Sequence, residues 1–420
     1  MRGLIGAARR HAFGRRRALT GLATFTAGTL LPTACAPPTD PSAGTAGDVY
    51  VALARSRAIA VLDPVTDREV GRISLESLGS RGHPWRLGVS PAGAAAVMPL
   101  SSDPAIGLVT ASGPPSGPPR ALPSAGGSPT ANRHRRCQWV RVDFGRRSPR
   151  SGATQTALAL TTDAVGHAYV LVGDGSARAP SYAAVVDLQT GNVLRHLHLA
   201  GAGESVLALQ AAPDGTRLYA SVWYWDDSSV WSGFSNARGR LIAVTTSDGT
   251  ATAQASLPQT SAVTDLSLAA SPDGRTGALY ATLATPGPAR LDGDGSDYVA
   301  VQHGLVALDG KRLSTLQHWP LPHQPTAVAI TRDGASAYVL SGSWVGPWSM
   351  RLTSLDLASG APTASWPLPG GCLSLAIAAN GRLYVADATG DRLWRVDTAT
   401  NSFLGSIAQP GAPLSVTARA

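Results

Sequence analysis

The sequence predicts an all-β fold, a seven-bladed β-propeller of four-stranded antiparallel blades, and three observations carry this prediction. Residues 50–63 return near the other end of the chain as residues 384–397, with matching spacing. Segments with Val, Leu, Ile and Tyr at period two are broken by Gly and Pro, and no long helical periodicity follows residue 48. The chain also begins and ends inside one repeat unit. Repeats of this size are typical of propellers and solenoids.

Each unit is expected to contain four strands, which we name A (innermost) to D (outermost). Strand B carries a Tyr in six copies and Val97 in the remaining one; the six are Tyr50, Tyr169, Tyr219, Tyr280, Tyr338 and Tyr384. Strand C is apolar and in most copies ends at Asp; it covers residues 59–63, 106–110, 184–188, 241–245, 305–309, 352–356 and 393–397. Strand B and strand C are therefore each found seven times in the sequence.

The turn between strands A and B, of the type Ser/Ala-Pro-Asp-Gly, is legible six times, as in residues 212–215 and 271–274. The seventh turn is missing because the chain starts inside a unit at Asp48 and ends after a lone strand at residues 414–417. We therefore expect the last blade to take strand A from the C-terminus and strands B, C and D from the N-terminus. Such closure removes free sheet edges.

These repeats resemble the YVTN-type β-propeller repeat family, whose unit has the Ser-Pro-Asp-Gly turn, the Tyr-Val strand and the Val-Ile-Asp strand. The resemblance covers roughly residues 48–420 and is weakest in the second copy, which lacks the Tyr. It implies the architecture and leaves the activity open, because propellers host unrelated functions.

The N-terminal segment, residues 1–35, is interpreted as an export signal. Arg9-Arg10 and Arg15-Arg16-Arg17 precede an apolar run at 22–31 that is too short for a membrane span and resembles a twin-arginine signal. Residues 31–35 resemble a bacterial lipobox ending at Cys35, with Pro32 as a departure, so lipidation of Cys35 is predicted; ordinary cleavage at the Ala34-Cys35-Ala36 triplet is the alternative. Residues 36–47 would be a flexible tether, and the protein would lie on the outer side of the cytoplasmic membrane, or be periplasmic or secreted if not lipidated.

The formal net charge of +8 does not predict nucleic-acid binding, because of where the charge lies. Six Arg fall in the first 17 residues, and residues 133–150 carry a net +6, so about −4 remains for the propeller body. A basic face on the blades is not expected. Residues 112–150, rich in Pro, Gly and Arg, are interpreted as a disordered basic insertion that could touch anionic envelope polymers.

Two cysteines, Cys137 and Cys372, would remain in an oxidising compartment after lipidation of Cys35. Cys372 opens a strand A, whereas Cys137 lies near the outer edge of the second copy. Whether the two form a disulfide stays open at this point.

Counting back from the turn Gly aligns strand A across copies and indicates which residues surround the central channel. One position holds Trp85, Leu207, Leu266, Thr326 and Leu373; the next holds Arg86, Ala208, Ser267, Ala327 and Ser374. Most channel residues are therefore small, with Arg86 and Gln210 as exceptions. Arg86 would either plug the channel through water-bridged contacts or bind an anion.

The B-to-C and D-to-A connections of an up-and-down blade emerge on one face, and this face gathers the candidate binding residues. The set comprises Trp223, Trp225, Trp231, Trp344 and Trp348 from B-to-C loops, with His83, Arg86 and His323 at the channel mouth. Rigid aromatic side chains give contact area at low entropic cost. The alternative is that these Trp pack on one another and cap the blades.

Metal and catalytic sites are weakly indicated. Asp292, Asp294 and Asp297 have the carboxylate density that calcium prefers, but His303 stands where an EF-hand loop has its twelfth-position Glu, so no cofactor is predicted beyond a possible calcium ion. No Ser/His/Asp set or cysteine nucleophile is singled out by spacing, and no catalytic residue is predicted.

The resulting functional hypothesis is an exported, lipid-anchored, monomeric propeller that binds an unidentified protein, peptide or glycan of the cell envelope through its aromatic loop face. The alternative class is an enzyme with a site at the channel mouth, either a lactonase-like hydrolase or a quinoprotein-like oxidoreductase. A purely structural envelope protein is the third possibility. The sequence specifies neither the ligand nor the pathway.

Overall fold

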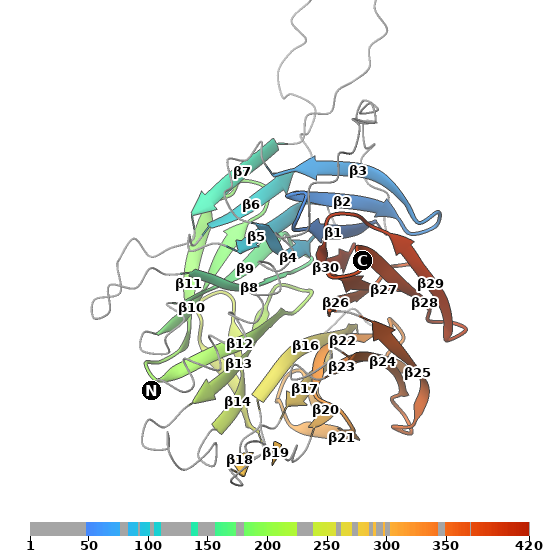
Figure 1. Ribbon diagram of the computed structural model, residues 1–420. Coiled ribbons are helices and arrows are strands. Elements are labelled where there is room, and N and C mark those ends of the chain that lie inside the picture. The colour runs from blue at the N-terminus through green and yellow to red at the C-terminus, as the bar shows by residue number, and fades with distance from the viewer. Residues whose placement is uncertain are drawn as a thin grey trace, which may run out of the picture.

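The computed structural model describes residues 48–75, 83–90, 93–100, 105–110, 136–141, 156–173, 180–224, 238–257, 262–270, 276–284, 289–290, 297–298, 303–342, 349–369 and 371–419. These residues form seven four-stranded antiparallel sheets and one small two-stranded sheet, β18 (Ala289–Arg290) with β19 (Asp297–Tyr298). Figure 1 shows the seven sheets arranged as blades around a common centre.

Six blades follow the chain from the innermost strand to the outermost, and in one of them the small sheet of β18 and β19 lies in sequence between the second and third strands. They are β4 (His83–Val89), β5 (Ala95–Leu100), β6 (Ala105–Thr110) and β7 (Arg136–Arg141); β8 (Thr156–Thr162), β9 (His167–Gly173), β10 (Ser181–Asp187) and β11 (Val193–Ala200); β12 (Glu204–Ala211), β13 (Arg217–Tyr224), β14 (Arg238–Thr245) and β15 (Ala251–Ser256); β16 (Ala262–Ala270), β17 (Thr276–Ala284), β20 (His303–Asp309) and β21 (Thr315–Leu321); β22 (Pro325–Ile330), β23 (Ser336–Gly342), β24 (Ser349–Asp356) and β25 (Pro362–Pro369); and β26 (Cys372–Ile377), β27 (Arg382–Asp387), β28 (Arg392–Asp397) and β29 (Ser402–Ala408).

The closing blade combines both ends of the chain, as predicted. The C-terminal strand β30 (Pro413–Ala418) is innermost and pairs with β1 (Val49–Leu53), which is followed by β2 (Ala58–Asp63) and β3 (Arg68–Ser74). Consecutive innermost strands contact one another from β4 through β26 to β30, and β30 contacts β4, so the ring is complete. The predicted seven-bladed β-propeller with its terminal closure is confirmed.

The apolar core lies between neighbouring blades rather than inside any one of them. One buried cluster joins Tyr50, Ile59 and Val61 of the closing blade to Leu87 and Val97 of the next blade. Each blade is a sheet with two apolar faces, so it buries both only when a blade stands on either side. Seven such interfaces give the molecule its stability.

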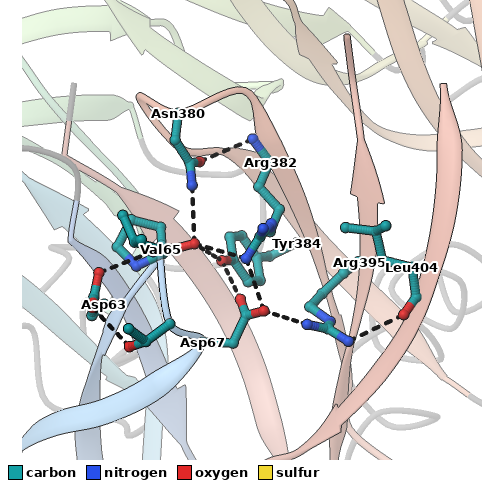
Figure 2. A network of polar contacts seen from close by, with 10 residues as sticks. Asp63, Val65, Asp67, Asn380, Arg382, Tyr384, Arg395 and Leu404 are labelled. Carbon is teal, nitrogen blue, oxygen red and sulfur yellow. Dashed lines mark hydrogen bonds and ion pairs between the residues drawn. The ribbon is translucent and has the colours of Figure 1, made fainter. Parts of the chain in front are cut away.

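A polar clasp joins the closing blade to the blade before it (Figure 2). The carboxylate of Asp67, in the β2–β3 turn, accepts a hydrogen bond of 2.7 Å from the Tyr384 hydroxyl and one of 2.8 Å from Arg382, and it also pairs with Arg395. The neighbouring carbonyl oxygen of Pro64 accepts bonds from Asn380 and Arg382. Side chains from residues more than 300 positions apart therefore fix the two ends of the ring together.

The strand-B tyrosines serve the same purpose in other blades. The Tyr219 hydroxyl donates to the carbonyl oxygen of Gly310, and the Tyr338 hydroxyl donates to Asn401, each in the C–D turn of the following blade. In these blades the repeated Tyr packs its ring in the core and ties one blade to the next through its hydroxyl, whereas the Tyr169 hydroxyl donates to Asp163 in the A–B turn of its own blade. The blade of β4 to β7 lacks this Tyr. The residue at the equivalent position of its strand B is Ala96, which pairs with Gly88, and not the predicted Val97.

The Asp that ends strand C closes the following turn. Asp187 Oδ1 accepts the backbone N–H groups of Gln189 and Thr190, and Asp309 does the same for Lys311 and Arg312. Four residues after each of these aspartates, and after Thr245 at the same position, the backbone takes positive φ; the residues are Asp67, Gly191, Gly249, Leu313, Gly360 and Asn401. The hydrogen bonds favour the carboxylate form and lower the pKa of both Asp187 and Asp309. These aspartates are therefore turn-forming residues.

The structure adds two findings on the second copy and its cysteine. Residues 136–141, part of the expected insertion, form β7, the outermost strand of their blade, whereas 111–135 and 142–150 lie outside the described residues. Cys137 lies in β7, and Cys372 is a buried free thiol in the innermost strand β26 of a different blade. Three strand spacings of about 4.8 Å within one blade already exceed the reach of a disulfide, so these two residues do not pair within one molecule.

Across the described part of the chain, no helix is long and apolar enough to cross a membrane.

Candidate functional site

The two ends of the ring differ in the length of their connections. B–C connections range from four residues, between β1 and β2, to 18 residues, between Ala284 and His303. The A–B and C–D connections at the opposite end contain four or five residues, apart from 111–135 between β6 and β7. Length variation of this kind is typical of loops that carry function on a rigid scaffold. We call the end formed by the B–C and D–A connections the loop face.

The predicted aromatic residues fall mostly in these connections. Trp223 lies near the end of β13 and is partly buried, next to the connection that holds Trp225 and Trp231. Trp225, Trp231, Trp344 and Trp348 lie outside the described residues, as do Cys35, Asp292 and Asp294. Asp297 lies in the short strand β19. The described strands that flank these connections end on one face, and the placement and role of the Trp side chains in the connections stay predictions.

The histidines predicted at the channel mouth have separate surroundings. Nδ1 of His83, the first residue of β4, lies 2.7 Å from the carbonyl oxygen of Ala54 in the β1–β2 connection. His323 is exposed in the connection before β22. It lies close enough to His303, at the start of β20, to lower the pKa of that residue, although burial of His303 is the larger cause. The two histidines are thus neighbours on the loop face, while His83 serves as a link between blades.

Every innermost strand contains a β-bulge at the equivalent position. The bulge determines how far along the propeller axis each following side chain lies. In each strand one residue is skipped in the pairing with strand B; these residues are Trp85, Leu158, Leu207, Thr264, Thr326, Leu373 and Leu414. The residues that follow them are Arg86, Ala159, Ala208, Asp265, Ala327, Ser374 and Ser415. We call these two sets the bulge ring and the charged ring. Bulges re-aim side chains at such positions.

The register in β16 differs from the alignment predicted by counting back from the turn. A second irregularity, between Leu268 and Ala270, adds length to this strand. Thr264 and Asp265, and not Leu266 and Ser267, therefore occupy the levels of Trp85 and Arg86. Counting back from the turn does not bring Asp265 to this level, because the count misses the additional irregularity in β16.

Asp265 is held by the next blade. Its Oδ2 accepts a hydrogen bond of 2.9 Å from the backbone N–H of Val328 in β22. Burial raises the pKa of Asp265 to about 6, against the opposing effects of this hydrogen bond and of the positive charge of Arg86. A carboxyl group with such a pKa can hold or release a proton near neutral pH.

Arg86 stands at the same level on the far side of the ring. The innermost strands follow one another in the order β4, β8, β12, β16, so Arg86 and Asp265 are three blades apart, the largest separation that seven blades allow. Burial lowers the pKa of Arg86 and the charge of Asp265 raises it, yet the guanidinium stays protonated at any working pH. Its guanidinium carbon lies 5.7 Å from the centroid of the Trp85 ring.

Other polar side chains of the innermost strands connect neighbouring strands. Glu204 pairs with Arg240 at 2.7 Å and accepts the backbone N–H of Gly201 at 2.8 Å. Ser374 Oγ exchanges hydrogen bonds of 3.3 Å with both backbone groups of Val416. Thr264 Oγ1 donates to the carbonyl oxygen of Pro325 at 2.9 Å. These groups are satisfied within the protein, whereas no hydrogen bond or ion pair of Arg86 is found among the described residues, which leaves its contact with Trp85.

Comparison with known proteins defines the class and not the activity. No family model matches the chain, and no curated protein matches it either. Its fold is similar to that of a candidate 6-phosphogluconolactonase from Bacteroides fragilis, with 13% identity and a TM-score of 0.56 over 90% of this chain and 99% of the other. It is also similar to a protein of unknown function from Desulfotomaculum acetoxidans, with 10% identity and a TM-score of 0.54 over 89% and 98%.

A third similar structure is a chain of hydrazine synthase from Kuenenia stuttgartiensis, with 12% identity and a TM-score of 0.52 over 80% of this chain and 89% of the other. Proteins with such different titles share the propeller, so the likeness concerns the fold alone. The protein is a seven-bladed β-propeller whose loop face and charged ring are the candidate sites.

Proposed function

We propose that this protein is an exported, lipid-anchored propeller that binds a protein, peptide or glycan of the cell envelope through its loop face. The observation that supports the proposal most directly is the asymmetry of the connections. Apart from 111–135, the long connections join strands at one end of the ring, and the sequence in and beside these connections contains Trp223, Trp225, Trp231, Trp344 and Trp348. A rigid ring that presents loops rich in Trp has the anatomy of a recognition module.

Binding to arrays of peptides and of envelope glycans tests this function. Replacing Trp225, Trp231, Trp344 and Trp348 with Ala should weaken binding to the recognised array features at least tenfold, because buried aromatic anchors carry most of the energy of such interfaces. Val65→Ala is the matched control, since Val65 is 73% exposed in a C–D turn at the opposite end. Unchanged binding by the quadruple variant, in a protein that keeps its β-sheet circular dichroism, would contradict the proposal.

The lipid anchor rests on the signal-like segment that ends at Cys35, and it has its own test. Protein purified from membranes of the native host should begin at Cys35 and carry the mass of a diacylglyceryl group. A Cys35→Ala variant should lose this mass and leave the membrane fraction. A mature chain without the added mass would favour the cleaved, unanchored alternative.

A second candidate, a hydrolase with a site at the channel mouth, is favoured by one observation. The carboxyl group of Asp265 has a pKa raised to about 6 near the axis, which suits a general acid or base. The similar structure from Bacteroides fragilis suggests 6-phosphogluconolactone as the substrate to try. A hydrolysis rate above the spontaneous rate, lost in Asp265→Asn, would support this candidate, whereas equal rates with and without protein would exclude this substrate.

A further inference from the structure

Two opposite charges face each other across a ring that is otherwise uncharged. In the seven innermost strands, all of which the structure describes, the side chains that carry a full charge at neutral pH are Arg86, Glu204 and Asp265. Glu204 is paired with Arg240. The charged ring therefore holds one cation, one anion, three alanines and two serines. Small residues at five of the seven positions place little side-chain volume next to the two charges.

Arg86 and Asp265 differ in geometry from the structural ion pairs of the same molecule. In the clasp, Asp67 lies 2.8 Å from Arg382, and its side chain is 13% exposed. Arg86 and Asp265 stand on opposite sides of the ring, and among the described residues no ion pair or hydrogen bond joins them. Asp265 accepts the Val328 N–H, whereas the partly buried Arg86 has only its contact with the Trp85 ring among the described residues, and a charge partly removed from water without a bonded partner costs free energy. Such an arrangement is costly for stability alone and is favourable where a ligand supplies the missing partner.

Apolar side chains stand next to the charges on the side of the loop face. Leu158 and Leu207 of the bulge ring are each 40% exposed although they belong to innermost strands. Each bulge residue precedes its partner in the charged ring, and every innermost strand starts at the loop face. A molecule that enters from the loop face therefore meets exposed Leu side chains first and Arg86 next.

We propose that the charged ring binds a small organic anion, whose acidic group pairs with Arg86 and whose apolar body contacts Leu158 and Leu207. The planar guanidinium fork suits a carboxylate or a phosphate. Asp265, held in place by Val328, lies opposite and accepts a hydrogen bond from a hydroxyl or amino group of the ligand when one is present. It also repels molecules with a second negative group. This site is independent of the Trp-bearing loops.

Hexanesulfonate, which stays ionised at any working pH, is the probe for the test, and hexanol is its neutral counterpart. Isothermal titration of the purified chain at pH 7.5 should give binding of hexanesulfonate at least tenfold tighter than of hexanol. Arg86→Met should remove this preference. Asp265→Asn should tighten hexanesulfonate binding several-fold, because it removes an opposing negative charge. Hexanoate and hexyl phosphate then separate a carboxylate site from a phosphate site by which of them binds more tightly.

The control is Arg68→Met, which removes one exposed Arg on the outermost strand β3 and should leave binding unchanged. Arg86→Lys, which keeps the charge, serves if the Met variant fails to fold, and it should weaken binding while keeping the preference for the anion. Equal affinity for hexanesulfonate and hexanol, or full binding by Arg86→Met, would overturn the proposal. Alanine at the four loop Trp should not change hexanesulfonate binding, so this site and the loop face can fail separately.

Discussion

The carboxyl group of Asp265 is subject to two opposing effects. Burial disfavours its charge, whereas the Val328 N–H and the charge of Arg86 favour it, and burial is the larger effect, so the pKa rises from 3.8 to about 6. The folded protein therefore binds this proton more tightly than the unfolded chain does. The stabilising contribution of the protonated carboxyl is complete below about pH 4 and is lost as the pH rises through about 6.

Asp265→Asn should remove this pH dependence, because the amide imitates the protonated acid. Above pH 6 the variant should be more stable than the wild type by about 2 to 3 kcal/mol, and at pH 4 the two should be equal. Thermal unfolding followed by circular dichroism at pH 4, 5, 6 and 7 measures this, with an expected gain in Tm of about 2 to 4 °C at pH 7. A variant that is less stable at pH 7 would mean that Arg86 and Asp265 form a net stabilising pair.

Cys372 is the second residue whose burial has a chemical consequence. It is fully buried in β26, and burial raises the pKa of its thiol, with a further increase from the charge of Asp387. The thiolate is the reactive form, so we expect no labelling of Cys372 by a maleimide at pH 8 in the folded protein and full labelling after unfolding in guanidinium chloride. Mass spectrometry of non-reduced peptides should also find no peptide that links Cys137 to Cys372.

Among the structural elements, strand B holds its blade to the next one in three of the seven blades, through the hydroxyl of its Tyr. Tyr219, Tyr338 and Tyr384 all donate to the C–D turn of the following blade. The turn that receives the bond is itself fixed by the Asp that ends strand C. The Tyr of one unit and the Asp of the next therefore act together in one contact between blades. The Tyr donates the hydrogen bond, and the Asp holds the turn that accepts it.

Tyr384→Phe should destabilise the protein, because it removes the hydroxyl that donates to Asp67 and leaves that largely buried carboxylate with fewer partners. The expected cost is about 1 to 2 kcal/mol. Tyr280→Phe is the matched control, since no hydrogen bond of the Tyr280 hydroxyl is found among the described residues, and its cost should be near zero. Chemical denaturation compares the two variants, and equal stability of both would show that the hydroxyl contact contributes nothing.

At the scale of the whole molecule, the ring depends on its closing blade. Strand β30 supplies the innermost edge of that blade and contacts β4 and β26 on either side. Without it, the inner edge of β1 has unpaired backbone groups, and such edges template association with other chains. The clasp between Asp67 and Arg382 also joins the two ends of the ring but does not replace the missing strand.

Truncation after Ala412, which removes β30, should therefore open the ring. We expect the truncated chain to elute as aggregates in size-exclusion chromatography and to be cleaved by protease much faster than the full chain. Removal of Ala420 alone is the control and should change neither property. A monomeric, protease-resistant product of the larger truncation would mean that the other six blades close without the C-terminal strand.

The number of blades, the order of strands and the closure follow from the sequence, because each repeat carries local signals for its own strands and turns. Residues 50–63 and 384–397 contain the same repeat unit. The absence of a seventh A–B turn indicates that the two termini share one blade. The loop face and the candidate Arg86 also follow from this local pattern, since alternating connections must emerge at alternate ends of a blade.

Which residues face each other across the ring depends instead on how the strands pack in three dimensions. Counting from the turn placed Ser267 opposite Arg86, whereas an additional bulge in β16 shifts the register and brings Asp265 to that level. The separation of Cys137 from Cys372 and the clasp at Asp67 likewise depend on which strands become neighbours. A bulge costs little in any one strand and leaves no distinct residue pattern, so its position is set by packing against the adjacent blades.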